Sequence, residues 1–199
     1  MDKRIKEWWE EGAKGIFDHC LQHIEQRIKA LKEFYDNVEE AIEEDVELVK
    51  DFHSDARKIT EHIEKDVKDP YLKHRQKFFV ICLKDYVFDL SFKMGQFSNI
   101  NEVGEELGKQ YEEVQNQMLA IKKRFENDDD SLNLGTIEEA TELVTSIKAL
   151  DEECAKMVEY RMTLEEERDS ILDEMEHFIR EKTEKLRIAE EEAAQELDD

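Results

Sequence analysis

An apolar or nearly apolar residue recurs at alternating spacings of three and four from Leu21 to Ile63. The members of this seam are Leu21, Ile24, Ile28, Leu31, Tyr35, Val38, Ile42, Asp45, Val49, Phe52, Ala56, Ile59 and Ile63. A helix with 3.6 residues per turn keeps a 3.5-residue repeat on one face only by supercoiling around a partner. The seam therefore predicts a long helix that buries one stripe against other helices.

Composition agrees with long helices and argues against strands. Charged residues make up 41% of the 199 residues, and the chain has only one proline and six glycines. Proline and glycine are typical of the tight turns that connect short strands, and both are scarce in this chain. We expect an all-α fold, in one domain that spans residues 1–199.

Three segment boundaries follow from turn chemistry. We expect the first helix over about 3–67, with Gly12 and Gly15 weakening its opening turns, so that residues up to Gly15 form either a separate or a frayed helix. Asp69 and Pro70 suit the N-cap and first position of a second helix over about 70–126; a single helix kinked at Pro70 is the alternative. The loop expected over 127–135 ends at Thr136 and Glu139, which have the spacing of a capping box.

The third helix, expected over about 136–197, carries a second regular seam. Its members are Ile147, Leu150, Cys154, Met157, Arg161, Leu164, Arg168, Ile171, Met175, Phe178 and Lys182. Short connections favour antiparallel neighbours. The leading architecture is an elongated bundle of three long antiparallel helices with coiled-coil packing, and the acidic C-terminus from Glu190 should fray into solvent.

The second helix is apolar on most of its sides between Phe78 and Phe92. A helix of this kind is normally covered on most sides. We therefore expect it to be the inner element of a bundle or the centre of a dimer interface, and dimerisation is expected. Gly95, Ser98, Asn99 and Asn101 disturb the helical phase, which predicts a kink or a short break near 95–101.

The formal net charge of −24 excludes nucleic acid as a main partner, because nucleic-acid binding depends on basic side chains that neutralise phosphates. Acidic segments over 1–67 and 127–199 flank a nearly neutral one over 68–126. No apolar run is long enough to span a membrane, and acidic residues interrupt the first twenty positions, so a cytoplasmic location is expected. Cys20, Cys82 and Cys154 are expected to be reduced thiols among apolar neighbours.

Candidate metal and catalytic groups are incomplete. His19, Cys20 and His23 share a helical face, but a structural zinc site needs four ligands. Glu174 and His177 have the spacing of a di-iron motif in a single copy. The acidic run at 128–130 lacks the other ligands of a calcium loop. We therefore expect a protein that is not an enzyme and that has no metal site, no cofactor and no small-molecule substrate.

Charged residues inside the seams are more informative. Asp45 interrupts the first seam, and Arg161, Arg168 and Lys182 interrupt the second seam, in the third helix. An unpaired charge in a desolvated seam costs several kcal/mol. Either these side chains extend outward to water, or Arg161 and Arg168 pair with acidic residues of a neighbouring helix and, with Asp45, set the register.

The N-terminal segment presents Ile5, Trp8, Trp9 and Phe17 on one side of a helix, together with Ile16. Adjacent tryptophans near a terminus favour partner grooves or membrane interfaces. Three interpretations remain open, namely capping of the protein's own bundle, docking of a partner, and insertion into lipid.

The sequence favours a non-enzymatic structural or adaptor coiled-coil protein that mediates protein–protein assembly, with other helical proteins or a second copy of itself as partners. An alternative comes from the stretch Asn101-Glu102-Val103-Gly104-Glu105-Glu106-Leu107, which is similar to helical sequence in BAR-type curvature-sensing modules. The length and the three long helices also resemble such modules. This resemblance implies a peripheral protein that binds or shapes membranes in vesicle trafficking. BAR modules usually present basic residues on a concave face. The chain departs from this pattern because its only basic clusters are Lys73-Arg75-Lys77 and Lys122-Lys123-Arg124.

Overall fold

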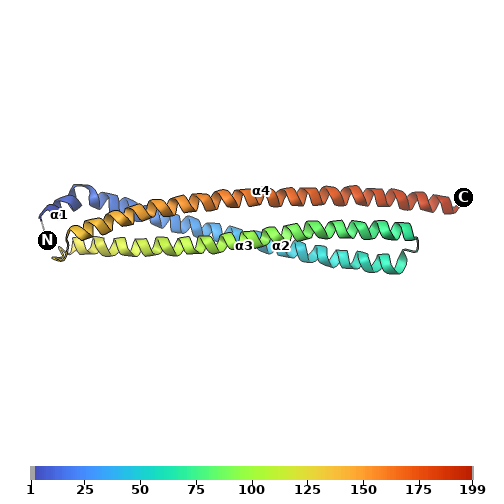
Figure 1. Cartoon of the computed structure of the whole chain (residues 1–199), viewed down its shortest axis with the longest axis horizontal. Coiled ribbons are helices and arrows are strands. Elements are labelled where there is room, and N and C mark those ends of the chain that lie inside the picture. The colour runs from blue at the N-terminus through green and yellow to red at the C-terminus, as the bar shows by residue number, and fades with distance from the viewer. Residues whose placement is uncertain (1–2, 199) are drawn as a thin grey trace. The chain divides into compact units, whose positions relative to one another are not determined.

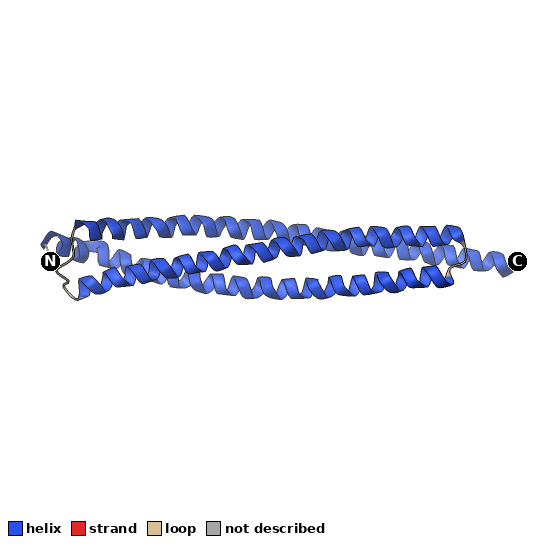
Figure 2. Ribbon diagram, turned by 60° about the horizontal axis from the view of Figure 1, so that its bottom comes forward, coloured by secondary structure: helices blue, strands red, loops and turns tan. Residues whose placement is uncertain are grey.

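The structure is a computed structural model that describes residues 3–198; the side chains of residues 55, 63, 186, 189, 190 and 192–198 fall outside the description. A short helix α1 (Lys3–Trp8) and a π-helical turn η1 (Trp9–Ala13) precede three long helices, α2 (Lys14–Asp66), α3 (Pro70–Glu126) and α4 (Leu134–Asp198) (Figure 1). Residues 3–198 contain helices and loops and no strand (Figure 2). The predicted all-α fold of long, mutually packed helices is confirmed.

The chain divides into two compact units. Unit 1 comprises Met1–Glu39 and Asn99–Arg161, and unit 2 comprises Glu40–Ser98 and Met162–Asp199. Each unit therefore takes one stretch from each of the three long helices. The coiled-coil seams supply both cores, as shown by the burial of Ile24, Leu31, Val38 and Ala56 from the first seam.

In unit 1, α3 runs antiparallel to α2 and α4. Lys122 of α3 pairs with Asp18 near the start of α2 at 2.5 Å, and Tyr111 of α3 donates a hydrogen bond to Asp151 of α4. The side chains of Tyr111, Met118 and Ile24 are fully buried between these helices. Burial of side chains of this size is worth about 1.5–3 kcal/mol each, so they supply much of the stability of the unit.

Two glycines on α3 let α2 approach closely in unit 1. A Cβ atom at Gly104 would lie 2.7 Å from Cε1 of Tyr35 and 3.2 Å from Sδ of Met157, and one at Gly108 would lie 3.2 Å from the Tyr35 hydroxyl oxygen. The Tyr35 ring thus lies over the notch that the two glycines leave on the helix. Burial and the nearby Glu105 raise the pKa of Tyr35 to about 12.

Unit 2 has the same alternation of helix direction and a smaller set of buried aromatic residues. Ala56 of α2 and Val80 of α3 are buried together, with Phe79 packed against them. The Phe79 ring stacks on Phe178 of α4 with 5.5 Å between ring centroids, and Tyr86 contacts the same ring. Leu83, Val87, Leu90 and Met175 are also buried in this unit.

The helix boundaries around Pro70 follow from capping. Helix α2 ends at Asp66, and α3 begins at Pro70 with Asp69 before it. The Asp69 carboxylate accepts a hydrogen bond from the backbone N–H of Tyr71 at 2.9 Å. This bond satisfies one of the donors that the first turn of a helix leaves free.

The start of α4 lies two residues before the predicted one. Thr136 was expected to be the N-cap, but α4 begins at Leu134, which places Asn133 at the N-cap. The buried Thr136 hydroxyl instead accepts a hydrogen bond from the backbone N–H of Asn133 at 3.3 Å. In a capping box the side chain of the third helical residue accepts a hydrogen bond from the N-cap backbone N–H. Thr136 therefore occupies this third position, and not the N-cap position that was expected for it.

No break interrupts α3 near 95–101, because α3 is helical from Pro70 to Glu126, and the alternative of a kink stays a prediction. Phe97 and Ile100 are buried on its inner face, and this packing keeps the segment helical despite Gly95 and Asn99. The bend near the N-terminus is at Gly12, whose φ of 174° and ψ of −29° are not helical. The predicted core role of Ile63 and the fraying of the last acidic side chains concern residues whose side chains lie outside the description.

Candidate functional site

An aromatic cluster closes the end of unit 1. The Trp9 ring stacks on Phe125 of α3, with ring centroids 4.3 Å apart and an angle of 5° between the planes, and it meets Phe17 edge-on at 5.2 Å. Trp8 lies 6.0 Å from Phe125. The ion pair between Lys6 and Asp128, at 3.1 Å, joins α1 to the loop after α3. Ile5, Trp9 and Phe17 are buried within their own unit, whereas Trp8 is half-buried.

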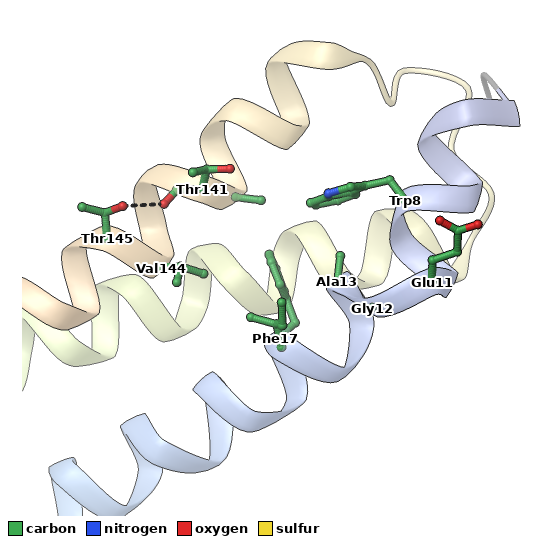
Figure 3. A pocket seen from close by; sticks show the side chains of 10 residues that line it. Trp8, Glu11, Gly12, Ala13, Phe17, Thr141, Val144 and Thr145 are labelled. Atoms are coloured by element: carbon green, nitrogen blue, oxygen red, sulfur yellow. Dashed lines mark hydrogen bonds between the residues drawn. The ribbon is translucent and has the colours of Figure 1, made fainter.

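An open pocket of about 480 Å³ adjoins this cluster, between the Gly12 bend and the start of α4. Trp8, Ala13 and Phe17 face Thr141, Val144 and Thr145 across it (Figure 3). The two threonine hydroxyls donate to the backbone carbonyls of Ile137 and Thr141. The lining is mostly apolar, with the Glu11 carboxylate beside it.

A polar cluster in the middle of unit 1 gathers around Asp151. His23 Nε2 lies 2.8 Å from Asp151 Oδ2, Arg27 Nε donates to Oδ1 at 3.2 Å, and the Tyr111 hydroxyl donates to Oδ1 at 2.6 Å. Burial by itself would raise the pKa of Asp151, but the hydrogen bonds from Tyr111 and His23 and the charge of Arg27 outweigh it and hold the pKa below its usual value. The carboxylate is thus held in a network that links all three helices of the unit.

His23 and Cys20, which the sequence pattern offered as candidate metal ligands, have other roles in the structure. His23 points to Asp151, and Cys20 is a half-buried free thiol whose pKa is raised by burial and by Asp151. Among the side chains that the structure describes, no three His, Cys, Asp or Glu residues gather in a way that could hold a metal ion.

The charged seam residues occupy two different environments. In unit 2, Arg168 of α4 makes a two-pronged contact with Asp45 of α2, from Nε to Oδ2 at 2.6 Å and from Nη2 to Oδ1 at 2.5 Å. Asp45 is 2% exposed. In unit 1, the guanidinium of Arg161 lies 4.6 Å from the centre of the Phe34 ring. The ammonium of Lys182 lies 5.6 Å from the centre of the Phe178 ring in unit 2.

The largest exposed apolar feature lies on α3 in unit 2. Five large side chains there are 57–73% exposed, and they form what we call the α3 stripe: Tyr71, Phe78, Ile81, Phe88 and Phe92. Their numbers fit one heptad frame, with Tyr71, Phe78 and Phe92 at first core positions and Ile81 and Phe88 at fourth positions. The opposite face of the same stretch carries the buried Val80, Leu83, Val87 and Leu90.

The sequence prediction that this helix is covered on most sides therefore does not hold within the chain itself, because three packed helices use only one of its two apolar faces. The remaining face amounts to several aromatic side chains in a line. Monomeric proteins seldom expose apolar patches above about 300–600 Å², and larger ones mark interaction sites. The α3 stripe is the surface that most needs an explanation.

The charges along the stripe differ from those elsewhere on α3. Lys73 and Lys77 pair with Glu64 of α2, and Lys93 pairs with Glu167 of α4. Six residues in or beside the stripe make no ion pair with any residue that the structure describes: Lys68, His74, Arg75, Lys84, Asp85 and Asp89. The basic members are concentrated toward the start of α3, and the acidic members lie after Lys84.

Sequence reasoning missed the Asp151 cluster and the separation of the two faces of α3. Asp151 lies next to the seam residue Leu150, and its partners come from helices whose register against α4 no single-helix pattern specifies. The heptad frame of the stripe was present in the numbers 71, 78, 81, 88 and 92, but it was masked by the second apolar face of the same helix.

No described helix is long and apolar enough to cross a membrane. Comparisons of the chain with protein-family models, with curated proteins and with solved structures give no match.

Proposed function

We propose that this chain is a non-enzymatic structural or adaptor protein that uses the α3 stripe to dock a helix of another polypeptide chain. The observation that carries this proposal is the line of five exposed large apolar side chains in one heptad frame. A 3.5-residue repeat matches the side-chain spacing of a second helix lying lengthwise, which buries such a stripe in knobs-into-holes packing.

Two further features support an assembly role. Charged residues without partners border the stripe, as they do where e and g positions select a partner helix. The polar cluster around Asp151 uses its carboxylate to join three helices, which is a structural use of those groups. Acidic surfaces elsewhere would discourage non-specific association while the stripe supplies the specific contact.

The proposal is tested by comparing assembly sizes in an extract of the source cells. A tagged chain should sediment in a larger particle than the purified protein does at the same concentration. The double variant Phe78→Ser/Phe88→Ser should move to the size of the purified chain, because it loses the apolar contacts of the stripe. The matched control Val103→Ser/Leu119→Ser removes two exposed apolar side chains from the same helix outside the stripe and should keep the large particle. Equal sedimentation of all three proteins would contradict the proposal.

A second candidate function is binding to anionic membranes, as in the BAR-like alternative. It is favoured by the basic residues Lys68, Arg75 and Lys84 beside the exposed aromatic side chains, since interfacial helices combine these features. Asp85 and Asp89 lie along the same stretch and oppose it. Co-sedimentation with liposomes of anionic and of neutral lipid decides the point: binding that requires anionic lipid and is lost in Phe78→Ser/Phe88→Ser would favour the membrane, and protein left in the supernatant would exclude it.

A further inference from the structure

The α3 stripe has a charge pattern that suits one particular occupant. Resting on the proposed docking function, we infer that the partner helix is α3 of a second copy of this chain, lying antiparallel, with Tyr71 opposite Phe88 and His74 opposite Asp85 of the other copy. In an antiparallel pair, the core positions 71, 78, 85 and 92 of one copy meet the core positions 74, 81 and 88 of the other.

Parallel pairing is unfavourable because it sets each residue against its own copy. The two Asp85 carboxylates would then face each other in the middle of the contact. Like charges in opposed positions destabilise a coiled coil and select against that orientation.

Antiparallel pairing allows registers that differ by seven residues. In the register with Tyr71 opposite Phe88, Phe78 lies opposite Ile81. The polar layer joins His74 to Asp85, which can form a hydrogen bond or an ion pair, and by symmetry it occurs twice. Shifting one way sets Asp85 against Ile81. Phe92 extends past the start of α3 of the second copy in the proposed register, and shifting the other way moves Phe88 past it as well. Both shifts leave a carboxylate or an aromatic residue without a suitable partner.

The flanking charges agree with this register. In antiparallel coiled coils the e positions of the two helices lie beside each other. Arg75 and Asp89 occupy e positions here, and Lys68 lies in the connection just before α3. Asp89 of one copy falls between Lys68 and Arg75 of the other. None of these three residues has an ion-pair partner in its own chain among the described side chains. Lys77 approaches Lys84 of the other copy, but Glu64 of its own chain pairs with Lys77.

The area is adequate for a dimer. Aromatic side chains bury about 150–250 Å² each, so the four aromatic stripe residues and Ile81, at 57–73% exposure, offer on the order of 600 Å² per chain. Flanking side chains would bring this close to the roughly 800 Å² per partner of a standard interface.

The register is tested with single-cysteine variants in a Cys20→Ser/Cys82→Ser/Cys154→Ala background, which removes all three free thiols of the chain. In the proposed dimer, residue 71 lies beside residue 88 of the other copy and about 25 Å from its own counterpart, at 1.5 Å per residue. A disulfide bridges Cα atoms up to about 7 Å apart. Oxidised Tyr71→Cys and Phe88→Cys should each remain uncrosslinked alone, and an equimolar mixture should give crosslinked dimer.

Light scattering on the unmodified protein completes the test, with a mass of twice 23.7 kDa expected. Crosslinking within either single variant would establish a parallel or shifted pairing and overturn the inference. A dimer without a crosslink in the mixture would assign the dimer to another face and also overturn it. If the purified protein is a monomer at roughly 100-fold its concentration in the cell extract, self-pairing is overturned. The sedimentation result for Phe78→Ser/Phe88→Ser would still decide the docking function separately.

A charge exchange gives a second test that does not depend on crosslinking. His74→Asp should weaken the dimer at least tenfold, because the carboxylate introduced at position 74 would then face Asp85 of the other copy. Adding Asp85→Lys to that variant should restore the affinity to within a few-fold. Both positions are exposed, so the helical circular dichroism of the variants should match the parent. Failure of the second change to rescue the first would contradict the His74–Asp85 layer.

Discussion

At Gly104 a missing side chain sets how closely α2 and α3 approach in unit 1. Gly104→Ala places a methyl group 2.7 Å from the Tyr35 ring and 3.2 Å from Sδ of Met157, so both side chains must move. Overpacking of this kind costs about 1–3 kcal/mol. We expect the free energy of unfolding to fall by that amount in urea denaturation.

Gly95→Ala is the matched control for this prediction. It lies in the same helix, and an added Cβ would meet nothing within 4 Å. Its effect should be a gain of about 0.5–1 kcal/mol from helix propensity. A loss at Gly104 no larger than the change at Gly95 would show that the notch under Tyr35 is not tightly packed.

Asp151 should make part of the stability depend on pH. Its pKa in the folded protein is lower than the ordinary value of about 3.9, so its contribution is complete above that value and is lost as the pH falls through the folded pKa. Asp151→Asn should cost about 1.5–3 kcal/mol at pH 7, because it removes the charge that Tyr111, His23 and Arg27 surround. The difference between the two proteins should shrink below pH 4 in chemical denaturation. An equal difference at pH 7 and pH 3 would contradict the role of the ionised carboxylate.

At the scale of the elements, the Asp45–Arg168 pair joins α2 to α4 in unit 2. Arg168→Leu leaves Asp45 buried without a partner and should lower the free energy of unfolding by about 3–5 kcal/mol. The double variant Asp45→Leu/Arg168→Leu removes both charges and should recover most of that loss. Thermal unfolding of the parent, both single variants and the double variant gives the coupling energy. A double variant as unstable as Arg168→Leu would mean that the loss arises from packing of the arginine stem instead.

The helices were predictable because their causes are local. The seam with buried Ile24, Leu31 and Val38 has a period that belongs to helices alone, and Asp69 with Pro70 caps a helix from its own sequence. The start of α4 was displaced because Asn133 and Thr136 both suit a cap, and only the tertiary burial of Thr136 decides between them.

The contacts between helices were less predictable for a physical reason. Periodicity says which residues share a face, but it does not say which residues of a neighbouring helix lie opposite that face. Tyr35 above the Gly104–Gly108 notch and Asp151 among His23, Arg27 and Tyr111 both depend on the relative register of helices far apart in sequence. The exposure of the α3 stripe depends in addition on how many partners a helix finds within its own chain.

At the scale of the whole molecule, charge should govern the proposed self-pairing. Each copy carries a formal net charge of −24, so two copies repel one another over long distances. The screening length falls from about 30 Å at 0.01 M salt to about 8 Å at 0.15 M, whereas the close contacts in the stripe are mainly apolar. We expect the dissociation constant of the dimer to fall several-fold over this range in analytical ultracentrifugation. A rise would mean that the Lys68, Arg75 and Asp89 contacts dominate over the net repulsion.

The stacking of Trp9 on Phe125 also gives the protein an internal optical reporter. Trp8 and Trp9 are the only two tryptophans of the chain, and both belong to unit 1. Tryptophan fluorescence, excited at a wavelength that tyrosine does not absorb, therefore follows the melting of unit 1 alone, whereas the helical signal in the far ultraviolet follows both units. Coincident curves would indicate one cooperative transition, and separated curves would resolve the melting of each unit without any added label.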